Sequence, residues 1–202
     1  MRVLVVGPQD HPLAGELARH DLELEWDGVG AEALVTLPPE PELVPAAELD
    51  GEAFEDAIRR WAEEPFFAAQ PWLAAALERG SGSWVAVTSI LGTQPFPGGA
   101  AAGAGALALQ TLTRVAALEG GPRGVRANVV APGWLEGAVP RGIDADLAVA
   151  DTPLQSLATP ATIAATVAWL LSPAAAQVTG EVLRVDGGYT ITRGSRPDPR
   201  EE

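Results

Sequence analysis

Short apolar runs that end at glycine or proline alternate along this chain with segments of helical periodicity. The run Arg2–Val6 ends at Gly7, and the run Ala31–Leu37 ends at a pair of prolines. An apolar run of this length is typical of a strand that is buried on both faces. Helices that connect such strands cover the two faces of a parallel sheet. The alternation therefore predicts an α/β fold with a doubly wound, open parallel sheet.

The same patterns predict where the elements begin and end. Residues 1–189 are expected to form one domain, and the polar, proline-bearing segment 190–202 is expected to be a flexible tail. Pro65 and Pro71 are expected to bend or divide the longest helical segment. We expect strands over residues 2–6, 22–26, 31–37, 84–88, 125–130 and 181–185, and helices over residues 12–20, 52–79, 102–118 and 160–171.

Composition excludes several classes of function. The 202 residues contain no cysteine and no lysine, and 27 acidic residues against 13 basic ones leave a net charge of −14. This charge repels nucleic acid and anionic membranes, so neither is expected as a partner. Two histidines are too few for a histidine-based metal cluster, and no metal is expected. The glycine-rich apolar stretch Pro97–Thr113 is shorter than a membrane span, and we expect a cytoplasmic protein.

The second half of the chain contains four segments whose order and spacing are informative. They are Gly82–Ser89, Leu112–Glu119, Gly124–Trp134 and Val178–Tyr189. Each segment is a loose pattern alone, but together they resemble the short-chain dehydrogenase/reductase family specifically. The resemblance implies a Rossmann-like sheet that binds a nicotinamide dinucleotide.

The resemblance also implies four catalytic positions, and only one of them keeps the residue of the family. The family uses a serine that holds the substrate oxygen, a tyrosine that exchanges a proton, a lysine beside it and an asparagine in a proton relay. The serine is present as Ser89, whereas the tyrosine, lysine and asparagine positions fall on Ala102, Ala106 and Trp61. Since the chain has no lysine in any alignment, the usual proton-transfer pair cannot be assembled.

The part of the family pattern that binds the cofactor is also altered. The first turn of the family needs glycines so that backbone N–H groups reach the pyrophosphate, but here Gly7 is followed by Pro8, Asp10, His11 and Pro12. Only residues 28–31 separate the second strand from the next, so a helix-strand-helix unit of the family is missing. No cofactor is therefore expected; a divergent enzyme would use NAD or NADP.

These positions define a vestigial pocket in which we expect His11 and Trp61 to fill the space of the absent cofactor and substrate. An open cleft beside Ser89 would instead favour an enzyme or a ligand-binding protein. A grouping of Asp10, His11 and Ser89 is a further alternative, because it resembles the triad of serine hydrolases. The remaining members of the expected pocket are Gly7, Ala102, Ala106, Pro132 and Gly133.

The favoured hypothesis is a non-catalytic family member that acts as a structural or regulatory subunit. It would form homo-oligomers or hetero-oligomers with an active relative, and small residues on the helix 102–118 would provide the close helix contact between subunits. The alternatives are a divergent NAD(P)-dependent short-chain oxidoreductase and a small-ligand-binding protein that uses the vacated cleft near Ser89.

Overall fold

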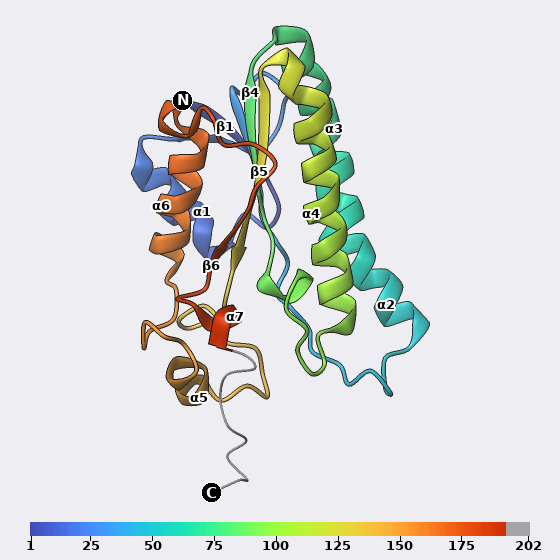
Figure 1. Ribbon diagram of the computed structural model, residues 1–202. Helices are drawn as coiled ribbons and strands as arrows, with labels where there is room; N and C mark the ends of the chain where they lie inside the picture. Colours follow the sequence, from blue (N-terminus) through green and yellow to red (C-terminus); the bar gives the residue numbers. More distant parts are fainter. Residues whose placement is uncertain (193–202) are drawn as a thin grey trace, which may run out of the picture.

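The computed structural model describes residues 1–192, and a single sheet of six strands lies at its centre (Figure 1). The strand order is β2-β1-β3-β4-β5-β6, and every neighbouring pair is parallel. The predicted α/β fold with a doubly wound parallel sheet is confirmed. The strands are β1 (Arg2–Val6), β2 (Glu23–Glu25), β3 (Ala33–Thr36), β4 (Gly82–Val87), β5 (Val125–Pro132) and β6 (Val182–Val185).

Helices cover both faces of this sheet (Figure 1). On one face, α1 and α6 enclose a core that includes Leu17 and Val167. On the other face, α3 and α4 enclose a second core around Trp72 and Trp84. The helices are α1 (Pro12–Leu17), α2 (Gly51–Ile58), α3 (Glu64–Arg79), α4 (Ala100–Gly120), α5 (Ala145–Ala150), α6 (Pro160–Leu171) and α7 (Tyr189–Thr192), with short helical segments η1 (Ala18–His20), η2 (Arg59–Glu63), η3 (Ile90–Gly92), η4 (Gly121–Arg123) and η5 (Pro173–Ala175).

The connection between β2 and β3 is short, as predicted. Residues 26–32 alone join the two strands, which lie on opposite sides of β1. The indole Nε1 of Trp72 donates a hydrogen bond of 2.9 Å to the carbonyl of Ala31, and Arg79 donates a second one of 3.2 Å. The α3 helix thus holds this connection in place, and the loss of a helix-strand-helix unit is confirmed.

The predicted helix over residues 52–79 is continuous, but one turn of it is wider than an α-helix. The η2 segment is a π-helix that joins α2 to α3, and Pro65 is the second residue of α3. A proline has no N–H to donate, and the change of helical register lies within one turn of it. The wide turn places Trp61 and Ala62 in the interior of the protein.

Two glycines of α4 serve close contacts within the chain, and the contact between subunits that its small residues were expected to provide stays a prediction. A Cβ at Gly105 would lie 2.5 Å from Cβ of Trp61, and a Cβ at Gly103 would lie 2.7 Å from the carbonyl oxygen of Leu91.

The helical segment Ala100–Arg123 is long and apolar enough to cross a membrane by length and composition, and 56% of its most apolar window is buried inside this fold. A core helix of an α/β protein explains both properties.

Two features near the carboxyl ends of the strands differ from the predictions. The helix α5 was not predicted; Asp144 caps it by accepting hydrogen bonds from two backbone N–H groups.

Residues 190–192, which were expected to belong to the tail, belong to α7. The Asp186 carboxylate accepts hydrogen bonds there from Thr190 and from the N–H of Gly188. Burial opposes ionisation of Asp186, but these hydrogen bonds outweigh it and lower the pKa of the carboxyl group. Residues 193–202 of the expected tail lie outside the described residues.

Candidate functional site

A cavity of about 300 Å³ lies at the carboxyl edge of the sheet. The turn after β1, the loop after β3 and the ends of β4 and β5 meet there, as expected for the ligand-binding edge of a doubly wound sheet. The lining residues come from five parts of the chain: Pro8, Asp10, His11, Pro12 and Leu13; Pro38, Pro39, Glu40 and Pro41; Trp61; Val87, Thr88 and Ser89; and Pro132, Gly133, Trp134, Leu135, Ala138 and Pro140.

The cavity brings together five of the residues predicted for the pocket, namely His11, Trp61, Ser89, Pro132 and Gly133. The sequence did not single out Trp134 or Glu40, which also line the cavity. Trp134 could have been predicted as a pocket residue, because it directly follows Pro132 and Gly133, which match the family pattern. Glu40 could not have been predicted, because a carboxylate in a proline-rich loop is usually solvated.

Gly7, Ala102 and Ala106 are not among the residues that line the cavity. Gly7 supports the fold instead, because a Cβ there would lie 2.8 Å from Cβ of Leu37 and its φ of +138° suits only glycine. The two alanines lie behind Trp61, in the apolar cluster described below.

The expectation that His11 and Trp61 fill the old cleft is wrong. Both side chains line the cavity, but they leave about 300 Å³ open. Trp61 packs against α4, where the absence of a side chain at Gly105 leaves room for its Cβ. His11 is held in place by its own helix, where Nδ1 accepts a hydrogen bond of 3.2 Å from the N–H of Leu13.

The positions of the family's proton-transfer pair are sealed in an apolar cluster. Ala102 is 1% exposed and Ala106 is fully buried, and both pack in the same cluster as Trp61, Ile90 and Leu91. Neither methyl group can exchange a proton. The cavity is lined by Trp61 and by neither of the two alanines.

Ser89 lies at the end of β4, and its side chain takes part in the local backbone structure. Its hydroxyl oxygen accepts a hydrogen bond of 3.2 Å from the N–H of Leu91 and thereby caps η3. Its carbonyl oxygen accepts a hydrogen bond of 3.1 Å from Nε2 of Gln110. The hydroxyl proton has no acceptor within the described residues and is free to serve a ligand.

The turn between β1 and α1 offers few backbone donors to an anion. Pro8 and Pro12 have no N–H group, and the N–H of His11 donates to the carbonyl of Pro8 at 3.2 Å. The N–H of Leu13 donates to the His11 side chain, and the N–H of Ala14 donates to the His11 carbonyl at 2.9 Å. Most donors that would hold a pyrophosphate are therefore missing or already engaged, and the residues present do not fit a dinucleotide.

His11 is the one histidine that contacts the cavity, and burial determines its protonation. Desolvation lowers its pKa from 6.5, against the opposing influence of the carboxylates of Glu40 and Asp10. Because Nδ1 accepts the hydrogen bond from Leu13, the neutral ring carries its proton on Nε2. Nδ1 therefore has no proton to donate to Asp10, and the predicted grouping of Asp10, His11 and Ser89 does not form a hydrolase triad.

This lowered pKa predicts a contribution of His11 to the pH dependence of stability. Below about pH 6.5, His11 is protonated in the unfolded chain more readily than in the folded protein, because burial lowers its pKa in the folded protein. The free energy of unfolding therefore falls as the pH falls through this range. In His11→Asn, which keeps an acceptor for the cap, this part of the pH dependence is expected to disappear. Chemical denaturation between pH 7 and pH 5 measures the difference. His20 is exposed, and His20→Asn is the control. If the free energy of unfolding changes with pH at the same slope in wild type and in His11→Asn, the prediction is contradicted.

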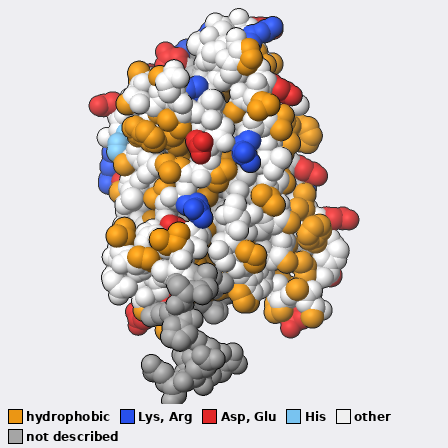
Figure 2. All heavy atoms as spheres, viewed as in Figure 1, with side chains coloured by type: hydrophobic (Ala, Val, Ile, Leu, Met, Phe, Trp, Pro, Cys, Tyr) orange, Lys and Arg blue, Asp and Glu red, His pale blue; other side chains and the backbone are white. Residues whose placement is uncertain are grey.

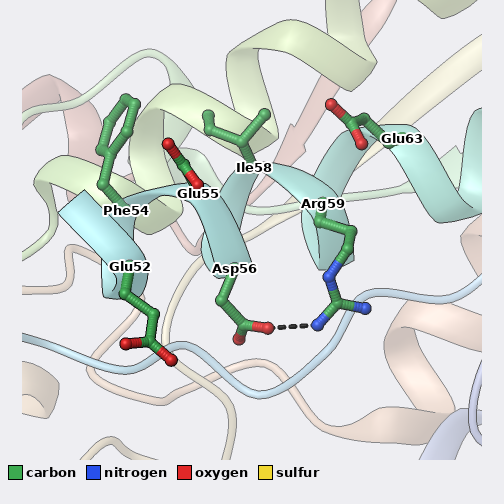
Figure 3. A pocket seen from close by; sticks show the side chains of 7 residues that line it. All are labelled: Glu52, Phe54, Glu55, Asp56, Ile58, Arg59 and Glu63. Atoms are coloured by element: carbon green, nitrogen blue, oxygen red, sulfur yellow. Dashed lines mark hydrogen bonds and ion pairs between the residues drawn. The ribbon is translucent and has the colours of Figure 1, made fainter.

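A second hollow, of about 510 Å³, lies along α2 and η2 and is shown in Figure 3. All of its lining side chains come from this one helical stretch, and Phe54 and Ile58 point to the opposite side of the helix from Glu52 and Asp56 (Figure 3). Its one cation, Arg59, is bonded to Asp56 and Glu64. No facing element closes this hollow, and among residues 1–192 no three histidine, cysteine, aspartate or glutamate side chains are grouped to hold a metal ion.

Comparison with known proteins places the chain in a family. The family model described as enoyl-(acyl carrier protein) reductase matches residues 37–190. A cis-4-hydroxycyclohexanecarboxylate dehydrogenase from Sinomonas cyclohexanicum is 40% identical over 114 residues, which is 55% of this chain and 46% of that protein. A galactitol 2-dehydrogenase (L-tagatose-forming) from Cereibacter sphaeroides is 34% identical over 157 residues, 72% of this chain and 60% of that protein. The chain thus spans about half the length of the curated relatives it matches.

Solved structures show the same fold. The crystal structure of a gluconate 5-dehydrogenase from Burkholderia cenocepacia J2315 in complex with NADP and tartrate matches with a TM-score of 0.84, over 94% of this chain and 95% of that chain. At 20% sequence identity this match supports the fold alone. Together with the family model and the sequence relatives, it shows that this chain belongs to the short-chain dehydrogenase/reductase family.

Proposed function

We propose that this chain is a non-catalytic member of its family that acts as a structural or regulatory subunit of an oligomer. The observation that carries this proposal is the burial of the proton-transfer positions, Ala102 and Ala106, in one apolar cluster with Trp61. Reduction of a carbonyl group requires a proton donor beside the new alkoxide. Neither alanine supplies one, and lysine is absent from the whole chain.

The turn after β1 supports the further proposal that the chain binds no nicotinamide dinucleotide. Most of its N–H groups are missing or engaged, and Asp10 adds a negative charge to the cavity that adjoins it. The α1 helix has only six residues, so its dipole offers little attraction for a phosphate group.

Titration with NADH and NADPH tests this proposal. Energy transfer from Trp61 and Trp134, which line the cavity, would report a bound reduced nicotinamide. We expect no saturable signal up to millimolar cofactor, whereas an active reductase of the family, titrated in parallel, gives one. Saturable binding at micromolar cofactor would overturn the proposal.

The outer surface of α4 supports the oligomeric part of the proposal. Leu107, Val115 and Leu118 are 49%, 47% and 79% exposed and lie along one face of the helix. Hydrophobic side chains over this side of the molecule are visible in Figure 2. A second subunit, either a copy of this chain or an active relative, would bury this apolar stripe.

Native mass spectrometry tests this part of the proposal, alone and with a co-expressed active relative. We expect an oligomer from the wild-type chain and a monomer from Val115→Glu/Leu118→Glu, because two buried carboxylates oppose association. Leu147 is exposed on α5, away from the stripe, and Leu147→Glu is the matched control that should assemble as wild type does. A wild-type chain that is strictly monomeric in both settings would refute the subunit role.

The open cavity beside Ser89 favours a second candidate function. A divergent NAD(P)-dependent oxidoreductase and a small-ligand-binding protein would both use this space, and the Ser89 hydroxyl proton is free to contact a ligand oxygen. The cofactor titration separates these two, because only the oxidoreductase requires a dinucleotide. In each case a cytoplasmic location remains part of the proposal.

A further inference from the structure

The walls of the cavity combine an apolar surface with an excess of negative charge. Two indoles, those of Trp61 and Trp134, and seven prolines are among the nineteen lining residues. Asp10 and Glu40 line the cavity as well, and neither Arg nor Lys is among the lining residues. His11 is the remaining ionisable group, and its lowered pKa leaves it neutral near pH 7.

The two carboxylates act on the same region of the cavity. Both Glu40 and Asp10 raise the pKa of His11, against the stronger effect of burial, so the fields of both reach the imidazole. Within the described residues, neither carboxylate has a hydrogen-bond or ion-pair partner. By contrast, Glu42 of the same loop is paired with Arg60 at 2.9 Å. The charge of Asp10 and Glu40 is therefore available to a ligand.

From this arrangement we infer that the cavity binds a small apolar molecule that carries one protonated amine. The inference goes beyond the subunit role and rests on the proposed function in one respect, that no dinucleotide occupies the cleft. The ammonium group lies toward Asp10 and Glu40, and the apolar body lies between the proline-rich walls and the two indoles.

The chemistry of the cavity selects this class of ligand over its neutral and anionic counterparts. An ammonium group gains Coulomb energy from two unpaired carboxylates, and a tryptophan face attracts a cation further. A carboxylate or phosphate ligand is repelled by the same two groups. The volume of about 300 Å³ lies at the lower end of the range for small-molecule sites, so the ligand is small.

Calorimetric titration of the full-length chain near neutral pH tests the inference with probes of equal size. The probes are 2-phenylethylamine, 2-phenylethanol and phenylacetate, which are cationic, neutral and anionic. Methylamine tests for attraction of cations by the net charge of −14 alone. We expect the dissociation constant of 2-phenylethylamine to be at least about tenfold lower than those of the other three.

Charge-neutral variants locate the binding in the cavity. Asp10→Asn and Glu40→Gln are each expected to weaken amine binding about threefold, and the double variant about tenfold, as is typical of partly exposed charge pairs. Glu48 is exposed on the same loop but does not line the cavity, so Glu48→Gln is expected to bind as wild type does.

Several results would overturn the inference: equal or tighter binding of phenylacetate or 2-phenylethanol, equal binding of methylamine, no binding of any probe at millimolar concentration, or amine binding that the double variant leaves unchanged. NADPH added to the amine complex keeps the two proposals separate. If NADPH displaces the amine, the proposal that the chain binds no cofactor is wrong. If the amine does not bind, only the present inference is wrong.

Discussion

Restoring the tyrosine and lysine of the family at Ala102 and Ala106 is expected to unfold this protein rather than to activate it. Ala106 is fully buried in an apolar cluster, where an unpaired ammonium group costs several kcal/mol. A tyrosine at Ala102 would overfill the same cluster by about 1–3 kcal/mol more. Because a domain is typically stable by only about 5–15 kcal/mol, Ala102→Tyr/Ala106→Lys should lose most of its stability. Chemical denaturation measures the loss, and an NADPH oxidation assay should detect no activity.

Two further variants make this prediction specific. Ala161 and Ala165 have the same spacing but are exposed on α6, so Ala161→Tyr/Ala165→Lys is expected to remain folded. Adding Trp61→Asn to the restored pair is expected to recover part of the stability, because the smaller side chain opens a path from position 106 to the cavity. A restored pair with wild-type stability would show that Trp61 does not seal these positions.

Removal of the indole at Trp72 is expected to have the largest effect of any single truncation near the shortened part of the sheet. Trp72 is fully buried against the β3 and β4 side of the sheet, and it donates the hydrogen bond that holds Ala31. Replacing a buried aromatic residue with alanine typically costs about 3–5 kcal/mol. Trp72→Ala should therefore lower the free energy of unfolding by about 4 kcal/mol and loosen residues 26–32.

A graded series separates packing from the hydrogen bond. Trp72→Phe keeps much of the apolar contact but loses the indole N–H and part of the ring system, so the expected cost is about 1–2 kcal/mol. Trp169, which is 43% exposed on α6, is the control, and Trp169→Ala should cost less than about 1 kcal/mol. Hydrogen exchange of the amides in residues 26–32 reports the loosening. Unchanged exchange in Trp72→Ala would mean that the indole does not anchor this connection.

The order of elements was predictable because strands buried on both faces leave a clear signature. Runs such as Arg2–Val6 contain almost only apolar residues, and such runs place a strand between two helical layers. Helix caps also act locally: Thr159 accepts the hydrogen bond from Thr162 that its position before Pro160 predicts. The short α5 was missed, because six residues with one buried side chain leave no periodic pattern.

The candidate site was less predictable, because its shape depends on contacts between distant segments. The sequence correctly placed His11, Trp61 and Ser89 at one edge of the sheet but not the space between them. Trp61 packs against Gly105, more than forty residues away in the chain, and His11 is tied to its own helix through Leu13. Neither contact follows from local periodicity.

The amino-acid sequence by itself determined the fold class, the missing helix-strand-helix unit and the absence of the tyrosine and lysine pair, because each of these depends on residue identity and spacing along the chain. Only the tertiary structure decided that the cleft is open, that the turn after β1 has few free donors, and that Asp10 and Glu40 share one cavity. These properties depend on how side chains from separate segments pack, and packing is a property of the folded chain as a whole.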